Sequence, residues 1–305
     1  MMSKSSKIKN RVFNINLTHL LCLVPLILFS YYKNGILVYK ENYISFFSTL
    51  EYLVIPILIV VISYLFEIYY YIGIKKERDL SKVVNSFSPY ANLLCYLLCG
   101  PSDALYIIVP LIFIIDIIMK CIDKKVTINR VALFKCLLFV LLALIGKYNN
   151  ANILERIDGT QVFDLSESFV GFIVGEMGII SNLFILLSFI VLLFNKYYKK
   201  DIALVTLVTY ILFSMFFVLT GNITFNEVLG NTLNNGVLFS IIFVLTLSDA
   251  TPILRSGRII YSILIGILIA FFVNIFNIFI GIYFVILVMS LISPLINRLK
   301  ISVYK

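Results

Sequence analysis

The chain has 305 residues, of which 61% are hydrophobic and only 13% are charged, and its mean hydropathy is +1.03. Soluble domains are about half apolar and about a quarter charged, so this composition excludes a soluble protein and indicates one solvated mainly by lipid. The formal net charge is +9. Because the Lys and Arg residues lie in short loops beside apolar runs and form no basic domain, we do not expect a nucleic-acid partner.

Apolar runs of about 20 residues, the length that a helix needs to cross roughly 30 Å of hydrocarbon, recur along the chain. The first run follows a basic segment, as in a signal peptide, but no small-residue cleavage site comes after it, so we expect a retained helix. The fold predicted is an all-α polytopic membrane protein. Its ten transmembrane helices are expected near residues 18–32, 50–73, 86–99, 104–119, 130–147, 169–194, 202–220, 232–247, 258–273 and 277–296.

The charges of the loops orient these helices. If the N-terminus is cytoplasmic, the loops on the cytoplasmic side hold most of the Lys and Arg residues, and the opposite loops are poorer in them. The bias holds at nearly every loop, so we expect an even number of spans and both termini inside. The predicted parts are a cytoplasmic segment at 1–17, a five-helix repeat at 18–147, an outer loop at 148–168, a second five-helix repeat at 169–296 and a cytoplasmic C-terminus at 297–305.

Two short helices end at similar breaks, one in each half of the chain. The first break reads Gly100-Pro-Ser-Asp-Ala104 and the second reads Ser248-Asp-Ala-Thr-Pro252. Each falls between the third and fourth helices of a five-helix half, and an odd number of spans per half gives the two copies opposite orientations. Broken helices at matching places in inverted repeats indicate a central binding site. The alternative is a chance recurrence of Ser-Asp-Ala at two ordinary turns.

Charged residues inside the predicted spans are candidates for function, because they are costly in lipid. Glu67 lies among tyrosines near a helix end, where interfacial anchoring competes with a functional role. Asp116 and Lys135 lie near the cytoplasmic ends of their spans, where they can pair with each other. Glu176 follows Gly175 directly, and glycines on both sides loosen the helix beside this carboxylate, so we expect it to lie near a ligand.

The sequence gives little indication of a metal site, of disulfides or of the catalytic motifs of soluble enzymes. Cys95 and Cys99 share a helix face, where helix packing is favoured over half of a metal site because no second Cys or His pair occurs elsewhere. The five cysteines lie inside or beside predicted spans, so we expect no disulfide framework. No hydrolase triad, Walker loop, metalloprotease motif or dinucleotide fingerprint is present.

Four segments together resemble a known family, and their order and spacing agree with it over nearly the whole chain. They are Ser248–Pro252 with the Gly257-Arg258 helix start, Phe169–Glu176, Asn92–Pro110 and Asn129–Ala132. They are similar to the D subunit of the Rnf ion-translocating electron-transport complex and to its relative, the B subunit of the sodium-pumping NADH:quinone oxidoreductase. The resemblance implies a ten-helix inverted-repeat subunit that passes electrons through flavin, inside a larger complex in a bacterial plasma membrane, coupled to sodium or proton movement.

The resemblance also implies cofactor sites. Family members carry FMN on a Thr, through a phosphoester bond, in a Ser/Thr-Gly-Ala-Thr motif of an outer loop. The corresponding place here is Asp158–Val162, which lacks the full motif. Thr160 is then the expected acceptor, and the alternatives are a surface turn at Asp-Gly and a member that has lost covalent flavin. Riboflavin or a second, non-covalent flavin is expected near the breaks. The cofactor-binding residues predicted are Thr160, Gly175, Glu176, Asp249, Thr251, Arg258 and Asp103.

A rival function stays open at this point. Inverted repeats with broken helices are equally natural in a solute channel or a secondary transporter. A lipid-linked glycan polymerase or transferase is less favoured, because no loop is large and rich in Arg, His and Asp.

Overall fold

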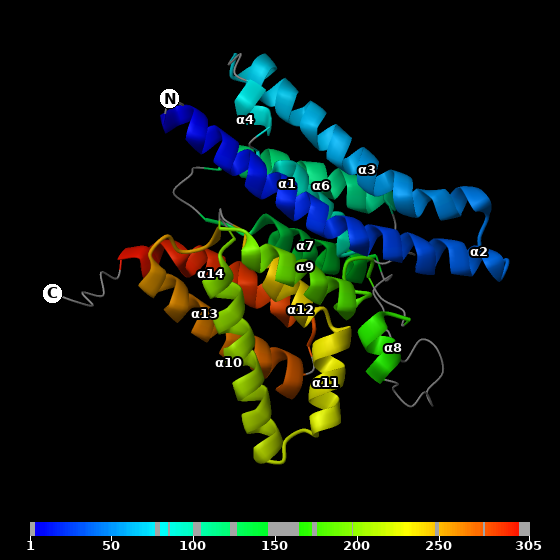
Figure 1. The fold of residues 1–305 in the computed structure, drawn as a ribbon, viewed down its shortest axis with the longest axis vertical. Coiled ribbons are helices and arrows are strands. Elements are labelled where there is room, and N and C mark those ends of the chain that lie inside the picture. The colour runs from blue at the N-terminus through cyan, green and yellow to red at the C-terminus, as the bar shows by residue number, and fades with distance from the viewer. Residues whose placement is uncertain are drawn as a thin grey trace. The chain divides into compact units, whose positions relative to one another are not determined.

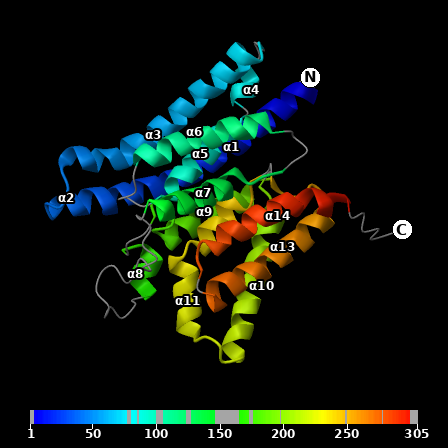
Figure 2. The same ribbon diagram turned by 180° about the vertical axis from the view of Figure 1, so that it is seen from behind.

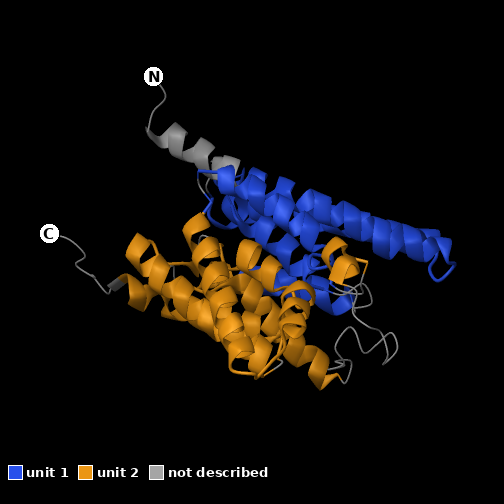
Figure 3. Ribbon diagram, turned by 60° about the horizontal axis from the view of Figure 1, so that its bottom comes forward, with its two compact units in different colours: residues 1–117, 175–198 blue, residues 118–174, 199–305 orange. Residues whose placement is uncertain are grey.

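The computed structural model describes residues 4–76, 80–84, 86–99, 105–122, 127–145, 165–172, 176–196, 198–247, 250–276 and 278–298. Every regular element within these ranges is a helix (Figures 1 and 2), which confirms the all-α prediction for the described part of the chain. The chain divides into two compact units (Figure 3). Unit 1 comprises residues 1–117 and 175–198, and unit 2 comprises residues 118–174 and 199–305.

These units are not the two halves of the sequence. Unit 1 takes the segment 175–198 from the second half, and unit 2 takes 118–147 from the first half. The repeats expected at 18–147 and 169–296 would be two copies of the same five-helix arrangement. Division into compact units does not test that equivalence, which stays a prediction. The compact units show instead that each half contributes one helix to the unit built mainly from the other half.

Unit 1 contains two long apolar rods. The first rod, expected only over residues 18–32, runs from Lys4 to Lys40, because nothing between Tyr31 and Lys40 breaks a helix. Gly35 belongs to this extension, and a Cβ added there would lie 3.1 Å from Thr49 Cγ2 in the second rod. The helices of unit 1 are α1 (Lys4–Ser30), η1 (Tyr31–Leu37), α2 (Val38–Lys40), α3 (Phe46–Ile68), η2 (Tyr69–Ile74), α4 (Leu80–Val84), α5 (Ser88–Leu97), most of α6 (Leu105–Cys121) and α9 (Asn182–Phe194).

The core of unit 1 lies around α5, whose ten residues are all buried. Its polar Asn92 is satisfied inside this core, because the Asn92 Nδ2 donates to Ser63 Oγ of α3 at 2.9 Å. Helix α9 packs against α1, where the Ser188 hydroxyl donates to the Cys22 carbonyl at 2.7 Å. Buried polar groups in apolar surroundings need such partners, so these bonds fix how the helices of unit 1 pack.

Unit 2 is organised around the neighbouring helices α10 and α13. They run in the same direction, because Thr206 bonds to the Ser262 carbonyl at 3.3 Å and Gly266 lies against Thr209 further along both helices. A Cβ on Gly266 would lie 1.9 Å from Thr209 Oγ1, so only glycine permits this close approach. The helices of unit 2 are α7 (Arg130–Leu144), α8 (Leu165–Val170), α10 (Lys200–Leu219), α11 (Phe225–Asn234), α12 (Val237–Phe239), η3 (Ser240–Val244), α13 (Arg255–Ala270), η5 (Phe271–Ile275) and α14 (Gly281–Arg298).

The described helices support a protein that crosses the membrane several times. Four are long and apolar enough to cross it, and the pair α11 and α12–η3, bent by 57°, makes a possible fifth. The bend lies at the break between Asn234 and Val237. Gly236 within this break has a φ of 68°, in the left-handed region that glycine tolerates. The ten-span count stays a prediction. The four spans are Leu17–Lys40, Phe46–Ile74, Lys200–Leu219 and Arg255–Ile275.

The helix expected over residues 169–194 is wrong as one continuous element. Helix α8 ends at Val170, the chain is not helical at 171, 172 and 176–181, and α9 begins at Asn182. Gly171 has a φ of 110°, which no helix contains, and Ser181 caps α9 by accepting a hydrogen bond from the Phe184 amide. The apolar composition predicted one long helix. The left-handed backbone at Gly171 and the new helix start capped by Ser181 divide it into two.

Candidate functional site

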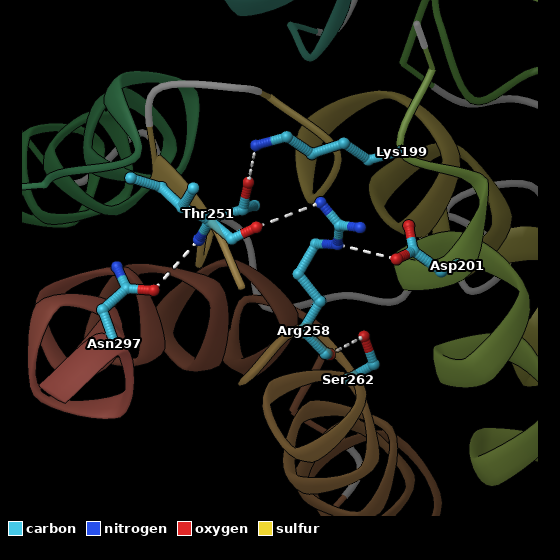
Figure 4. A network of polar contacts seen from close by, with 7 residues as sticks. Lys199, Asp201, Thr251, Arg258, Ser262 and Asn297 are labelled. Atoms are coloured by element: carbon cyan, nitrogen blue, oxygen red, sulfur yellow. Dashed lines mark hydrogen bonds and ion pairs between the residues drawn. The ribbon is translucent and has the colours of Figure 1, made fainter. Parts of the chain in front are cut away.

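The second break carries a network of charged and polar side chains in unit 2 (Figure 4). The Lys199 ammonium, directly before α10, donates a hydrogen bond to the buried Thr251 hydroxyl. The Arg258 Nε lies 2.6 Å from Asp201 Oδ2, and this ion pair joins the first turns of α13 and α10. Thr251 and Arg258, both predicted as site residues, therefore belong to one network.

The backbone of the break is held in place by the same network. The Arg258 guanidinium also donates to the Ile253 carbonyl at 3.3 Å, and the Ile253 amide donates to the Asn297 side chain of α14 at 3.0 Å. Gly257 packs closely here, since a Cβ on it would lie 3.3 Å from Ile296 Cγ2. Side chains from the start of α10, from α13 and from α14 thus hold the turn at Thr251–Ile253 by hydrogen bonds.

The electrostatics of this site favour an anion. Helices α10 and α13 both begin here, and a helix N-terminus carries partial positive charge and unsatisfied N–H groups. Four cationic residues, Lys199, Lys200, Arg255 and Arg258, lie at or directly before these helix starts, where Asp201 is paired with Arg258. The Lys200 and Arg255 side chains are exposed, and the Arg258 side chain keeps 23% of its surface exposed. The exposed Lys200 and Arg255 and the partly exposed Arg258 are therefore open to anions in the surroundings.

A second arrangement in unit 1 involves the chain around Glu176. The Gly178 amide donates to the Leu97 carbonyl at 2.7 Å, and the Met177 amide donates to the Cys99 carbonyl at 3.2 Å. The last carbonyls of a helix lack partners inside that helix, so the Glu176 segment supplies the cap of α5. Glu176 thus lies beside the helix end that leads into the first break.

Metal binding finds no support in the described residues, where no group of three His, Cys, Asp or Glu side chains gathers. Cys95 and Cys99 are free and buried, and the Cys99 thiol donates to the Cys95 carbonyl at 3.4 Å. Both cysteines therefore lie in the packed interior of unit 1.

The comparison with protein families decides the identity of the chain. Residues 2–304 match the family described as NQR2, RnfD, RnfE. The chain belongs to the NQR2, RnfD, RnfE family. The members of this family are membrane subunits of the ion-translocating Rnf and Nqr complexes, so the resemblance seen in the four sequence segments is confirmed. Among curated proteins, none matches the chain.

The structure places three of the seven residues that the family resemblance implied. Thr251 and Arg258 share the network at the second break, and Glu176 lies at the end of α5 in unit 1. The remaining four, Asp103, Thr160, Gly175 and Asp249, lie outside the described residues. Their roles in this family member stay predictions.

Sequence reasoning missed Lys199, Asp201 and Asn297, which complete the network. Lys199 was assigned only a topological role among the cytoplasmic loop charges. The signal for Asp201 was present, since an acidic residue in the first turn of an apolar span needs a cationic partner. The arginine that pairs with it is 57 positions away, so the sequence alone did not join them.

Proposed function

We propose that this member of the NQR2, RnfD, RnfE family is the membrane-embedded, electron-carrying subunit of an Rnf-like complex that couples a redox reaction to sodium or proton movement. The observation that carries the proposal is the family match over residues 2–304. Its partners are the other subunits of that complex and the lipid of a bacterial plasma membrane, with both termini cytoplasmic. The strongly apolar helices and the charge bias of the loops support this placement.

The network at the second break suits a flavin. A flavin supplies the electron transfer when bound, while the protein supplies position and electrostatics. Arg258 and Lys199 can hold the phosphate of FMN or the negative charge of a reduced ring, and the helix starts add to their field. Thr251 and Asp249 lie on the same break, within the second segment that resembled the family. This non-covalent site would hold the second flavin.

The first flavin is proposed to be FMN, joined by a phosphoester bond to the Thr160 hydroxyl. Support comes from the position of Thr160 ahead of the Phe169–Glu176 segment and from the loop charges, which predict this loop as outer. Asp103 belongs to the first break and Glu176 lies beside the helix end that leads into it, and both residues would line a flavin site or an ion path.

The covalent flavin is tested by producing the chain together with a flavin transferase and scanning the denatured gel band for fluorescence. A fluorescent band is expected for the native sequence and for Thr220→Ala, a control on another loop, and a dark band is expected for Thr160→Ala. A dark band for the native sequence would exclude covalent flavin.

The second flavin is tested by measuring the flavin released from the purified, folded protein by acid. Arg258→Gln is expected to lower this non-covalent fraction and to leave the covalent fraction unchanged. A native protein that holds neither flavin would instead favour the solute channel or transporter.

A further inference from the structure

Unit 2 has a second polar cluster, which lies at the opposite end of α10 from Arg258. Asn235 Nδ2 donates to Asn231 Oδ1 at 3.3 Å, Asn231 Nδ2 donates to Asn274 Oδ1 at 3.4 Å, and Asn274 Nδ2 donates to Ser214 Oγ at 2.8 Å. We call these four residues the amide cluster. It runs from the end of α11 through η5 to α10, and it holds the last turn of α11 in place.

A separate bond anchors the same turn of α11. The Thr232 and Tyr210 hydroxyls lie 3.0 Å apart, and Tyr210 is buried on α10. Gly236, in the left-handed region, then stops the helix two residues after Asn234. The last turn of α11 is therefore tied to its neighbours on both sides of Asn234, so the position of this residue is set by the fold.

Asn234 itself has no hydrogen bond from its side chain. Both its Nδ2 and its Oδ1 are buried, and neither has a hydrogen-bond partner among the residues that the structure describes. A buried carboxamide with both polar atoms unsatisfied is rare in a native protein, because it loses its bonds to water without replacement. Since the helix end around it is anchored, we take Asn234 as a group held ready for a ligand.

The chemistry of the carboxamide selects the ligand. It presents one donor and one acceptor side by side, which match a carbonyl next to an N–H on a planar ring. A metal cation would use only the oxygen, and an anion would use only the NH₂ group. The pyrimidine part of the isoalloxazine ring carries such an imide edge. We propose that Asn234 binds the imide edge of a flavin ring, beside the amide cluster.

The path of the chain supports this ligand. Helix α8 packs against α11 within unit 2. Thr160 precedes Leu165, the first residue of α8, by five positions. A flavin carried on Thr160 would therefore be tethered only five positions in the sequence before the helix that packs against α11. The inference rests on the proposed flavin at Thr160, and it names the residue that receives the ring of that flavin.

The test separates ring binding from covalent attachment by using riboflavin, which has no phosphate to attach. The full chain is produced without flavin transferase, placed in lipid nanodiscs and titrated with riboflavin, and the quenching of riboflavin fluorescence is followed. Riboflavin is expected to bind the native chain and to bind Asn234→Ala about tenfold more weakly, since one hydrogen-bonded group is lost. Repeating the titration in an Arg258→Gln chain removes the contribution of the second break.

Two further variants keep the result interpretable. Asn222→Ala changes an exposed asparagine whose side chain donates to the Thr220 hydroxyl, and it should bind riboflavin like the native chain. Asn234→Leu has nearly the same size and leaves no buried polar atom, so it should raise the thermal midpoint while it weakens riboflavin binding at least as much as Asn234→Ala does. The proposal is overturned if the native chain does not bind riboflavin or if Asn234→Ala binds it equally well. A dark gel band with Asn234-dependent riboflavin binding would refute only the covalent bond to Thr160.

Discussion

Arg258 and Asp201 form an ion pair of 2.6 Å between the first turns of two parallel helices, α13 and α10. The pair lies at the end of α10 where Lys199 reaches Thr251, so it sets the position of the second break relative to both helix starts. The side chains are about a quarter exposed, at 23% and 24%, which places the pair at the edge of unit 2 and within reach of ions and ligands.

Removing the Asp201 carboxylate should release Arg258 at a modest cost. We expect Asp201→Asn to lower the free energy of unfolding by about 1 kcal/mol, because partly exposed ion pairs contribute little. Chemical unfolding in mixed micelles measures this loss. In the Arg258→Gln chain the same substitution should cost less, since the pair is already broken. Equal costs in both chains would show that the two side chains do not interact.

Gly266 should tolerate no side chain. Gly266→Ala places a Cβ 1.9 Å from Thr209 Oγ1 and 2.9 Å from the Thr206 carbonyl, so α10 and α13 must move apart. We expect a loss of about 1–3 kcal/mol in the free energy of unfolding. Gly230→Ala is the matched control, because its Cβ meets nothing within 4 Å and alanine favours a helix. It should be neutral or stabilising in the same measurement.

Asn129 should contribute through two separate bonds within unit 2. Its Oδ1 caps α7 by accepting from the Ala132 amide at 3.1 Å, and its Nδ2 donates to the Val244 carbonyl of η3 at 2.8 Å. Asn129→Ala loses both and should lower the free energy of unfolding by about 2–3 kcal/mol.

The matched variant Asn129→Ser tells these bonds apart. Its hydroxyl oxygen can still cap α7 and it lacks the amide donor to Val244, so its cost should fall between those of the native chain and Asn129→Ala. Asn129→Ser that is as stable as the native chain would argue against the bond to Val244.

Cys121 allows a test of orientation without any mutation of the other cysteines. It is the only exposed one of the five cysteines, all of which fall within the described residues. The loop charges predict its end of α6 to be cytoplasmic. A membrane-impermeant maleimide should therefore label the protein only after the cells are opened, and Cys121→Ser should remove the label. Labelling of intact cells would place this end outside.

The sequence predicted what depends on composition and local pattern. The apolar runs located the helices, and the second break with its Gly257-Arg258 helix start contains Thr251 and Arg258, which the structure places in one polar network. It could not predict partners that are distant in the chain. Asp201 and Asn297 join the site only because α10, α13 and α14 start or end beside the break.

Local geometry explains the other differences from expectation. The helix expected to end at Tyr32 continues to Lys40. The sequence becomes more polar after Tyr32, but the backbone stays helical there. Glu67, placed among tyrosines where anchoring at the interface was one interpretation, is buried with 1% of its surface exposed. The sequence shows that a helix contains a charged residue, but it does not show whether a neighbouring helix covers that residue.

The exchange of segments between the two units has a consequence for how the protein is made. Unit 1 lacks α9 until the segment up to residue 198 has been synthesised. In unit 2, α7 packs against α14, the last helix that the structure describes, so this contact forms only at the end of synthesis. Neither unit can be completed in order of synthesis. The early helices of each unit therefore lack packing partners until later segments are made, and a chain truncated after α7 would leave both units unfinished.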